Sequence, residues 1–341
     1  MKIGIVNDTL MAAQVIAMVL EKSGKHDVLW TVANGAEAIT RCVQQQPDLI
    51  LMDLVMPGLN GAETTREILK RCSVAVLVVT ASVGTNCSLA FQAMGAGALD
   101  VIATPTLNNQ AGQEAFLRKI GQIQAIISTA QEPAPSPPVC RPDDLSCGGD
   151  GTAGRLVAIG CSAGGPTALS EILSSLPPLP DTAVVLVQHI DQRFVGELVE
   201  WLTSKSLCPV HLATEDALLR PETVYVSAAA GHLEVHACAR LRYTDQPLGL
   251  ACKPSVDVLF ASIVRNWRGR AMGAVLTGMG RDGANGLLQM RARGFLTLAQ
   301  DQATSAIFGM PKAAAVNGAA AEVLPLRAIA ARIQRWSQTG E

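Results

Sequence analysis

The sequence predicts two α/β domains, each a doubly wound parallel β-sheet covered by helices. Three observations support this prediction. In residues 1–125, short apolar runs alternate with segments of helical periodicity. The alternation stops in a segment rich in proline and glycine, and it starts again at Arg155. Runs such as 74–79 are apolar at every position, which is typical of strands buried on both faces of a parallel sheet.

The first domain is expected to cover residues 1–125. The expected strands are 2–6, 27–33, 48–54, 75–81 and 98–104, and the expected helices are 10–22, 35–46, 60–71, 86–95 and 112–128. Strands and helices that alternate with short connections are typical of a doubly wound sheet, because each helix must cross a face of the sheet before the next parallel strand begins.

The segment 126–153 is predicted to be a linker. It contains five prolines between residues 133 and 142, followed by glycines at 148, 149 and 151. Proline-rich chain is semi-rigid and glycine-rich chain is flexible, and neither builds a hydrophobic core. The linker therefore separates two independently folded parts of the chain.

The second domain is expected to cover residues 154–341 and to be less regular than the first. The expected strands are 155–159, 183–188, 223–226, 233–236, 271–276 and 295–299, and the expected helices are 166–176, 193–204, 255–266, 284–293 and 326–336. Between 205 and 250 the pattern indicates shorter strands and turns, with room for antiparallel pairs.

Composition excludes several classes of protein. Hydrophobic residues make up 49% of the 341 residues and charged residues 16%, so both domains can bury a core. The net charge of −2 gives no electrostatic footprint for nucleic acid. No apolar stretch approaches the ~20 residues of a membrane span, and Asn7-Asp8 interrupts the only N-terminal run that could be a signal peptide. Nine cysteines without a C-x-x-C pair indicate free thiols rather than a disulfide framework or a zinc site. We therefore expect a cytoplasmic protein with no nucleic-acid partner and no direct membrane insertion.

Polar residues follow the predicted strands of the first domain. Asp8 follows the first strand, Asp53 ends the third, Thr80 ends the fourth, and Thr104 ends the fifth. The carboxyl ends of parallel strands share one edge of the sheet, and acidic oxygens that converge there can hold Mg²⁺. A carboxylate at such a site can accept a phosphoryl group. The simpler alternative is that these residues only cap helices.

Three residues at strand ends of the second domain form a possible Ser/His/Asp set. Ser162 lies in the turn Gly160-Cys161-Ser162-Ala163-Gly164, His189 closes the apolar run 183–188, and Asp282 lies in a glycine-dense loop. A serine hydroxyl needs a base to take its proton, and an imidazole needs a carboxylate to fix its tautomer. Each residue alone has another explanation: a phosphate-binding or simple turn, a core histidine, and a helix cap. The order Ser, His, Asp differs from that of the α/β-hydrolases, which argues against that fold but not against the chemistry.

Residues 1–125 resemble a response-regulator receiver domain, which is flavodoxin-like. The resemblance implies that Asp53 is the phosphoacceptor, that Thr80 is the switch hydroxyl, and that Asp8, Asp53 and Val55 are ligands of Mg²⁺. Two positions depart from the family pattern: Asn7 replaces one of two usual acidic residues, and Thr104 replaces a usual lysine. The first change should weaken Mg²⁺ binding, and the second removes a cation from the phosphoryl site.

The second half resembles the catalytic domain of the chemotaxis protein-glutamate methylesterase (CheB) family. The matching blocks are 160–166, 187–190, 253–260, 276–283, 299–305 and 309–312. The resemblance implies that Ser162 is the nucleophile, His189 the general base, Asp282 the orienting carboxylate, and the backbone amide of Met279 an oxyanion donor. Ala163 stands where the family often has threonine, which should tune activity without abolishing it.

The family implies a reaction and partners. Ser162 would attack the γ-methyl ester of a glutamate in a methyl-accepting chemoreceptor and release methanol, and the same attack on glutamine would deamidate it. Ester hydrolysis would need no cofactor. The phosphodonor would be a CheA-like histidine kinase, and the unphosphorylated receiver is expected to inhibit the esterase. Asn7, Thr104 and the Cys161-Ser162-Ala163 sequence resemble the Wsp, surface-sensing branch of the family.

An alternative from another class is a receiver-linked binding module without catalysis, which would titrate a signalling partner. A DNA-binding response regulator is disfavoured, because the chain has no basic recognition helix.

Overall fold

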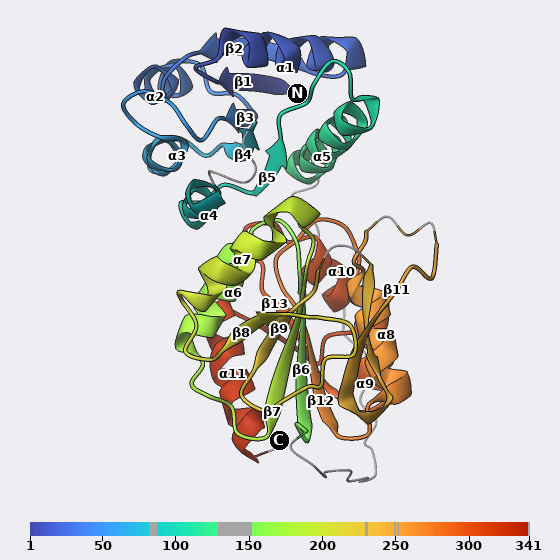
Figure 1. Ribbon diagram of the computed structural model, residues 1–341. Coiled ribbons are helices and arrows are strands. Elements are labelled where there is room, and N and C mark those ends of the chain that lie inside the picture. The colour runs from blue at the N-terminus through green and yellow to red at the C-terminus, as the bar shows by residue number, and fades with distance from the viewer. Residues whose placement is uncertain (82–86, 129–151, 229–230, 249, 251, 340–341) are drawn as a thin grey trace. The chain divides into compact units, whose positions relative to one another are not determined.

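The computed structural model divides the chain into two compact units, residues 1–131 and 132–341, which are described separately (Figure 1). The structure describes residues 1–81, 87–128, 152–228, 231–248, 250 and 252–339. The predicted linker lies outside the described residues from 129 to 151. No helix among the described residues is both long enough and apolar enough to span a bilayer.

The first unit is a five-stranded sheet in the order β2-β1-β3-β4-β5, and all its paired strands are parallel. Its strands are β1 (Lys2–Val6), β2 (Asp27–Val32), β3 (Leu49–Met52), β4 (Ala75–Thr80) and β5 (Asp100–Ala103). Its helices are α1 (Leu10–Ser23), α2 (Gly35–Gln44), α3 (Gly61–Leu69), α4 (Cys87–Gly95) and α5 (Gln110–Ser128). The predicted doubly wound fold is confirmed, and the order of strands reverses between β1 and β3, where open α/β sheets bind ligands.

The start of α3 packs directly against the turn after β3. Asn60 and Glu63 form a capping box, in which each side chain accepts a hydrogen bond from the other residue's backbone N–H. A Cβ atom at Gly61 would lie 2.1 Å from the carbonyl oxygen of Asp53, so only glycine allows this approach. The helix and its cap therefore fix the backbone of the predicted phosphoacceptor turn.

The second unit is a seven-stranded parallel sheet in the order β14-β13-β12-β6-β7-β9-β8, with a separate antiparallel pair, β10-β11. The strands of the large sheet are β6 (Arg155–Cys161), β7 (Thr182–Gln188), β8 (Val210–Leu212), β9 (Val224–Val226), β12 (Arg270–Val275), β13 (Leu296–Gln300) and β14 (Glu322–Leu324), and the pair consists of β10 (His232–His236) and β11 (Arg240–Thr244). The second predicted parallel-sheet domain is thus also confirmed.

Helices lie on both sides of this sheet, with α6, α7 and α11 on one side and α8, α9 and α10 on the other (Figure 1). The helices are α6 (Gly165–Ser175), α7 (Val195–Thr203), α8 (Val256–Asn266), α9 (Ala284–Ala292), α10 (Met310–Val316) and α11 (Leu326–Thr339), and the short 3₁₀ segments are η1 (Gln192–Phe194) and η2 (Ala237–Ala239). Every residue of β7 is buried, and Phe260 and Ile263 of α8 belong to the core of this unit. Burial on both faces explains why β6 and β7 are apolar nearly throughout.

Helix α10 and the short strands β8, β11 and β14 lie outside the predicted strands and helices. Strand β11 belongs to the antiparallel pair, within the segment 205–250 where only unspecified short strands were expected. Strands β8 and β14 have three residues each and lie at the two edges of the large sheet. Leu212 in β8 and Val323 in β14 are 41% and 45% exposed, so these strands lack the continuous apolar pattern of a central strand. Helix α10 has seven residues and begins at Met310-Pro311, too short for a helical period to be visible.

Candidate active site

The three strands at the centre of the large sheet end at the same edge, and each leads into a predicted catalytic residue. Ser162 directly follows β6, His189 directly follows β7, and Asp282 lies in the loop between β12 and α9. In register, Gly160 of β6 is paired with Val187 on one side and Val275 on the other. The parallel register therefore delivers three residues from distant parts of the sequence to one edge.

Two backbone hydrogen bonds extend this ladder past the strand ends. The N–H of Ser162 donates to the carbonyl of Thr277 at 3.0 Å, and the N–H of His189 donates to the carbonyl of Cys161 at 3.0 Å. Gln188 joins the same two residues, because its side-chain amide donates to the carbonyls of Ser162 at 2.9 Å and His189 at 3.0 Å. The backbones of the candidate nucleophile and base are thus held as part of the sheet.

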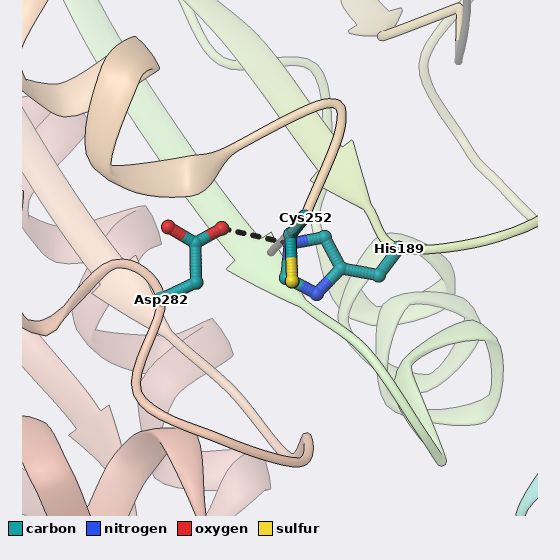
Figure 2. A group of neighbouring side chains, drawn as sticks. All are labelled: His189, Cys252 and Asp282. Carbon is teal, nitrogen blue, oxygen red and sulfur yellow. Dashed lines mark hydrogen bonds and ion pairs between the residues drawn. The ribbon is translucent and has the colours of Figure 1, made fainter. Parts of the chain in front are cut away.

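His189 and Asp282 are hydrogen-bonded to each other (Figure 2). Nε2 of His189 lies 2.8 Å from Oδ2 of Asp282, and both side chains are largely buried. An ionised carboxylate can only accept, so Nε2 carries the proton and donates it to this bond. In the neutral imidazole, Nδ1 is then the nitrogen that can accept a proton.

The N-terminus of α8 holds the carboxylate of Asp282. Its oxygens accept hydrogen bonds from the Ser255 hydroxyl at 2.7 Å and from the backbone N–H groups of Val256 at 2.7 Å and Asp257 at 3.1 Å. Burial alone would raise the pKa of Asp282, but the hydrogen bond and charge of His189, with the donors at α8, outweigh it and lower the pKa. Asp282 therefore stays ionised and keeps one orientation.

Ser255 contacts the candidate site directly, and sequence reasoning missed this contact. It is the N-cap of α8, and its hydroxyl accepts from Val258 N–H while donating to Asp282. Its own N–H donates to Nδ1 of the buried His232 at 3.1 Å. A serine before a helical pattern signals an N-cap, but nothing in the sequence shows that this cap faces Asp282.

Glycine is required at two positions around Ser162, one in the turn that carries it and one in the loop after β12. Gly164 has φ +75°, a left-handed conformation, and α6 begins at the next residue. A Cβ atom at Gly278 would lie 2.7 Å from Cβ of Ser162, so the loop after β12 passes directly over the serine. Met279 follows in this loop and is 7% exposed. Among the described residues, no partner is found for its backbone N–H.

The structure does not join Ser162 to His189. Across the described residues, the Ser162 hydroxyl makes no hydrogen bond to the imidazole, and Ser162 is 5% exposed. A third side chain, Cys252, lies beside His189 (Figure 2). Burial by itself lowers the pKa of His189, but its hydrogen bonds and charge interactions with Asp282 and Cys252 raise it to about 9. His189 must therefore lose a proton before it can act as a base near neutral pH.

In the first unit, Asp53 and Asp8 follow the adjacent strands β3 and β1. Asp53 accepts a hydrogen bond from the N–H of Leu54 at 2.7 Å. Burial and the charge of Asp8 together raise the pKa of Asp53 to about 6, although hydrogen bonds from Leu54 and Val55 oppose the shift. The two carboxylates thus repel each other, and a hard divalent cation held between oxygen atoms would relieve that repulsion. The donor set fits Mg²⁺.

The structure shows what surrounds Asn7 and Thr104, the two residues that depart from the receiver pattern. Asn7 is buried, and its side-chain oxygen accepts from the N–H of Thr9 at 2.9 Å, so this amide is part of the turn into α1. Thr80 is the buried last residue of β4, and its carbonyl accepts from the N–H of Thr104 at 2.9 Å. The hydroxyl oxygen of Thr104 is buried and has no hydrogen-bond partner among the residues that the structure describes.

Comparisons with known proteins identify both units. Residues 157–333 match the family model described as CheB methylesterase, and residues 3–115 match the response regulator receiver domain. The chain belongs to the CheB methylesterase family. It is 47% identical over 334 residues to "Protein-glutamate methylesterase/protein-glutamine glutaminase 4" of Burkholderia thailandensis, covering 97% of this chain and 96% of that protein. It is 46% identical over 338 residues to "Protein-glutamate methylesterase/protein-glutamine glutaminase 2" of Pseudomonas syringae pv. syringae, covering 98% of both.

A solved structure resembles the second unit. The CheB methylesterase catalytic domain of Thermotoga maritima is 30% identical, with a TM-score of 0.50, and the match covers 53% of this chain and 97% of that one. The resemblance to the CheB family inferred from sequence is therefore confirmed, by relatives over 97–98% of the chain and by this solved structure over the second unit.

We predict that Asp53→Asn stabilises the full-length protein at pH 8 without Mg²⁺. The wild-type carboxyl has a higher pKa folded than unfolded, so its ionisation destabilises the fold, and the wild type regains stability as the pH falls from above 6 towards 4. One pKa unit corresponds to about 1.4 kcal/mol, and solvent screens a half-buried carboxylate, so the gain should be at most about 2 kcal/mol.

Calorimetric unfolding at pH 8 and pH 5 measures this difference, with the exposed Asp27→Asn as the matched control. The stabilisation should be present at pH 8 and smaller at pH 5. An equal effect at both pH values, or the same gain in Asp27→Asn, would show that repulsion at Asp53 is not its cause.

Proposed function

We propose that this chain is a phosphorylation-regulated protein-glutamate methylesterase that removes methyl groups from glutamate γ-methyl esters of methyl-accepting chemoreceptors. The observation that carries the proposal is the hydrogen bond between His189 and Asp282 at the sheet edge where Ser162 also lies. Full-length relatives named for this activity support it.

In the proposed reaction, Nδ1 of His189 takes the proton of the Ser162 hydroxyl while Oγ attacks the ester carbonyl carbon. The imidazolium then gives this proton to the departing methoxide, and methanol leaves an acyl-enzyme. His189 then takes a proton from a water molecule, which attacks the acyl group. This step restores Ser162 and leaves a free glutamate carboxylate as product. Asp282 stabilises the imidazolium in both steps through Nε2.

In this proposal, two groups stabilise the negative oxygen that forms during attack. The backbone N–H of Met279 lies in the loop over Ser162, and α6 begins three residues after the serine, so its first N–H groups are directed towards the same turn. The same attack on the side-chain amide of glutamine would release ammonia, which gives the deamidation named for the relatives.

The receiver supplies the regulation in this proposal. Asp53 accepts a phosphoryl group from a CheA-like histidine kinase, and Thr80 contacts that group by its hydroxyl. Asp8, Asp53 and the carbonyl of Val55 would hold Mg²⁺, which supplies positive charge beside the phosphoryl oxygens. Thr104 provides no cation there. None of the relatives compared above carries a branch name, so assignment to the surface-sensing branch stays a prediction.

Replacing Ser162 with alanine should reduce demethylation by about 10⁴- to 10⁶-fold, because the hydroxyl that forms the acyl-enzyme is removed. Mass spectrometry of methylated receptor peptides, with and without a small phosphodonor, measures the loss of methyl groups. Ser174→Ala, an exposed serine on α6, is the matched control and should keep full activity. A wild-type protein that binds the receptor but never removes a methyl group would be the binding module instead.

The activity should rise with pH, with a midpoint above the usual histidine value of ~6.5, because His189 must be neutral to accept the serine proton. NMR titration of the His189 ring in full-length protein tests the cause. Its pKa should be near 9 in the wild type and should fall in Asp282→Asn, because burial then opposes the charged form without a carboxylate partner. A His189 pKa that is unchanged in Asp282→Asn contradicts the assignment.

A further inference from the structure

Cys252, whose thiol the proposed reaction does not use, forms a compact cluster with His189 and Asp282. One ring nitrogen of His189, Sγ of Cys252 and one carboxylate oxygen of Asp282 all lie within 4.8 Å of one another (Figure 2). The three residues come from the end of β7, from the segment before α8, and from the loop after β12. Because their spacing in sequence is so wide, no search for a metal-binding motif would bring them together.

The donor atoms of the cluster are those of a zinc site. Zinc prefers thiolate, imidazole and carboxylate ligands, in tetrahedral sites with bonds of about 2.0–2.3 Å. Such bonds place ligand atoms roughly 3–4 Å apart, so side-chain movements of about an ångström would close the cluster around an ion. All three residues are partly exposed rather than sealed, so an ion and a fourth, water ligand can reach them.

The surroundings of Asp282 prepare it as a ligand. Ser255 and the first N–H groups of α8 fix the carboxylate from behind. Such supporting hydrogen bonds orient metal ligands in known sites, and they would remain when an ion replaces the hydrogen bond to His189.

We propose that His189, Cys252 and Asp282 form an inhibitory Zn²⁺ site. Binding displaces the thiol proton of Cys252 to solvent and places the ion on the imidazole and carboxylate. The ion then either occupies the nitrogen that must accept the Ser162 proton or breaks the bond between His189 and Asp282. In both cases the esterase stops, and removal of the ion restores it. Mg²⁺ does not bind here, because it requires oxygen ligands.

This inference uses the residues of the proposed esterase, so its test has a readout that does not depend on activity. Full-length reduced protein is titrated with Co²⁺, which gives a thiolate-to-metal charge-transfer absorption when a cysteine is a ligand, and Zn²⁺ is then added to displace it. The absorption is expected in the wild type and absent in Cys252→Ala. Cys238→Ala, which removes an exposed thiol outside the cluster, should behave as the wild type.

The second readout is the demethylation rate of each variant, measured without Zn²⁺, with Zn²⁺, and after a chelator is added. Each rate is compared with the rate of the same variant without Zn²⁺. Removing a supporting residue of a metal site costs 10–100-fold in affinity, so loss of the Cys252 ligand should raise the inhibitory Zn²⁺ concentration by about 100-fold or more. Chelation should restore the wild-type rate.

The outcomes separate the two proposals. A Cys252-dependent cobalt absorption in a protein that never demethylates receptor would support the metal site and refute the esterase. An active wild type that shows no thiolate absorption, or that Zn²⁺ inhibits equally in Cys252→Ala, would overturn the metal site and leave the esterase standing.

Discussion

The candidate site depends on the parallel register of β12, β6 and β7. The ladder continues beyond the strands through the hydrogen bonds of Ser162 to Thr277 and of His189 to Cys161. A shift of one residue in either pairing would turn the side chains to the opposite face of the sheet, and the imidazole would leave the carboxylate. The central strands are almost completely buried, and their side chains pack against helices on both faces of the sheet, so a shift would disrupt that close packing on each face.

The orientation of His189 at this sheet edge depends on the carboxylate of Asp282. Its carboxylate receives hydrogen bonds from His189, from the Ser255 hydroxyl and from two N–H groups of α8, so both oxygens are satisfied by groups of positive character. An unpaired buried carboxylate would become protonated, and a protonated acid would stabilise the imidazolium poorly. The first turn of α8 is therefore part of the candidate site, although none of its residues faces the ester in the proposed reaction.

The sequence predicted the strand ends well and the side-chain contacts poorly. Apolar runs with a polar residue at the carboxyl end correctly placed Ser162, His189 and Asp53 at the ends of β6, β7 and β3, because burial of a central strand leaves a direct trace in sequence. Ser255 and Cys252 were missed as neighbours of the site, because their proximity depends on how α8 and the segment before it pack against the sheet. The edge strands β8 and β14 were missed because they are short and partly exposed, so burial does not impose a continuous apolar pattern on their sequences.

The two units share an architecture and differ in the atoms that they present at the carboxyl edge. In the first unit, the groups after β1 and β3 are carboxylate and carbonyl oxygens, which suit a small hard cation. In the second unit, an imidazole, a thiol and a carboxylate meet, and this set suits a softer ion or, without an ion, proton transfer. The same kind of sheet therefore provides the position in both cases, and the residue types at the strand ends decide which chemistry is proposed there, phosphoryl transfer in the first unit and attack on an ester in the second.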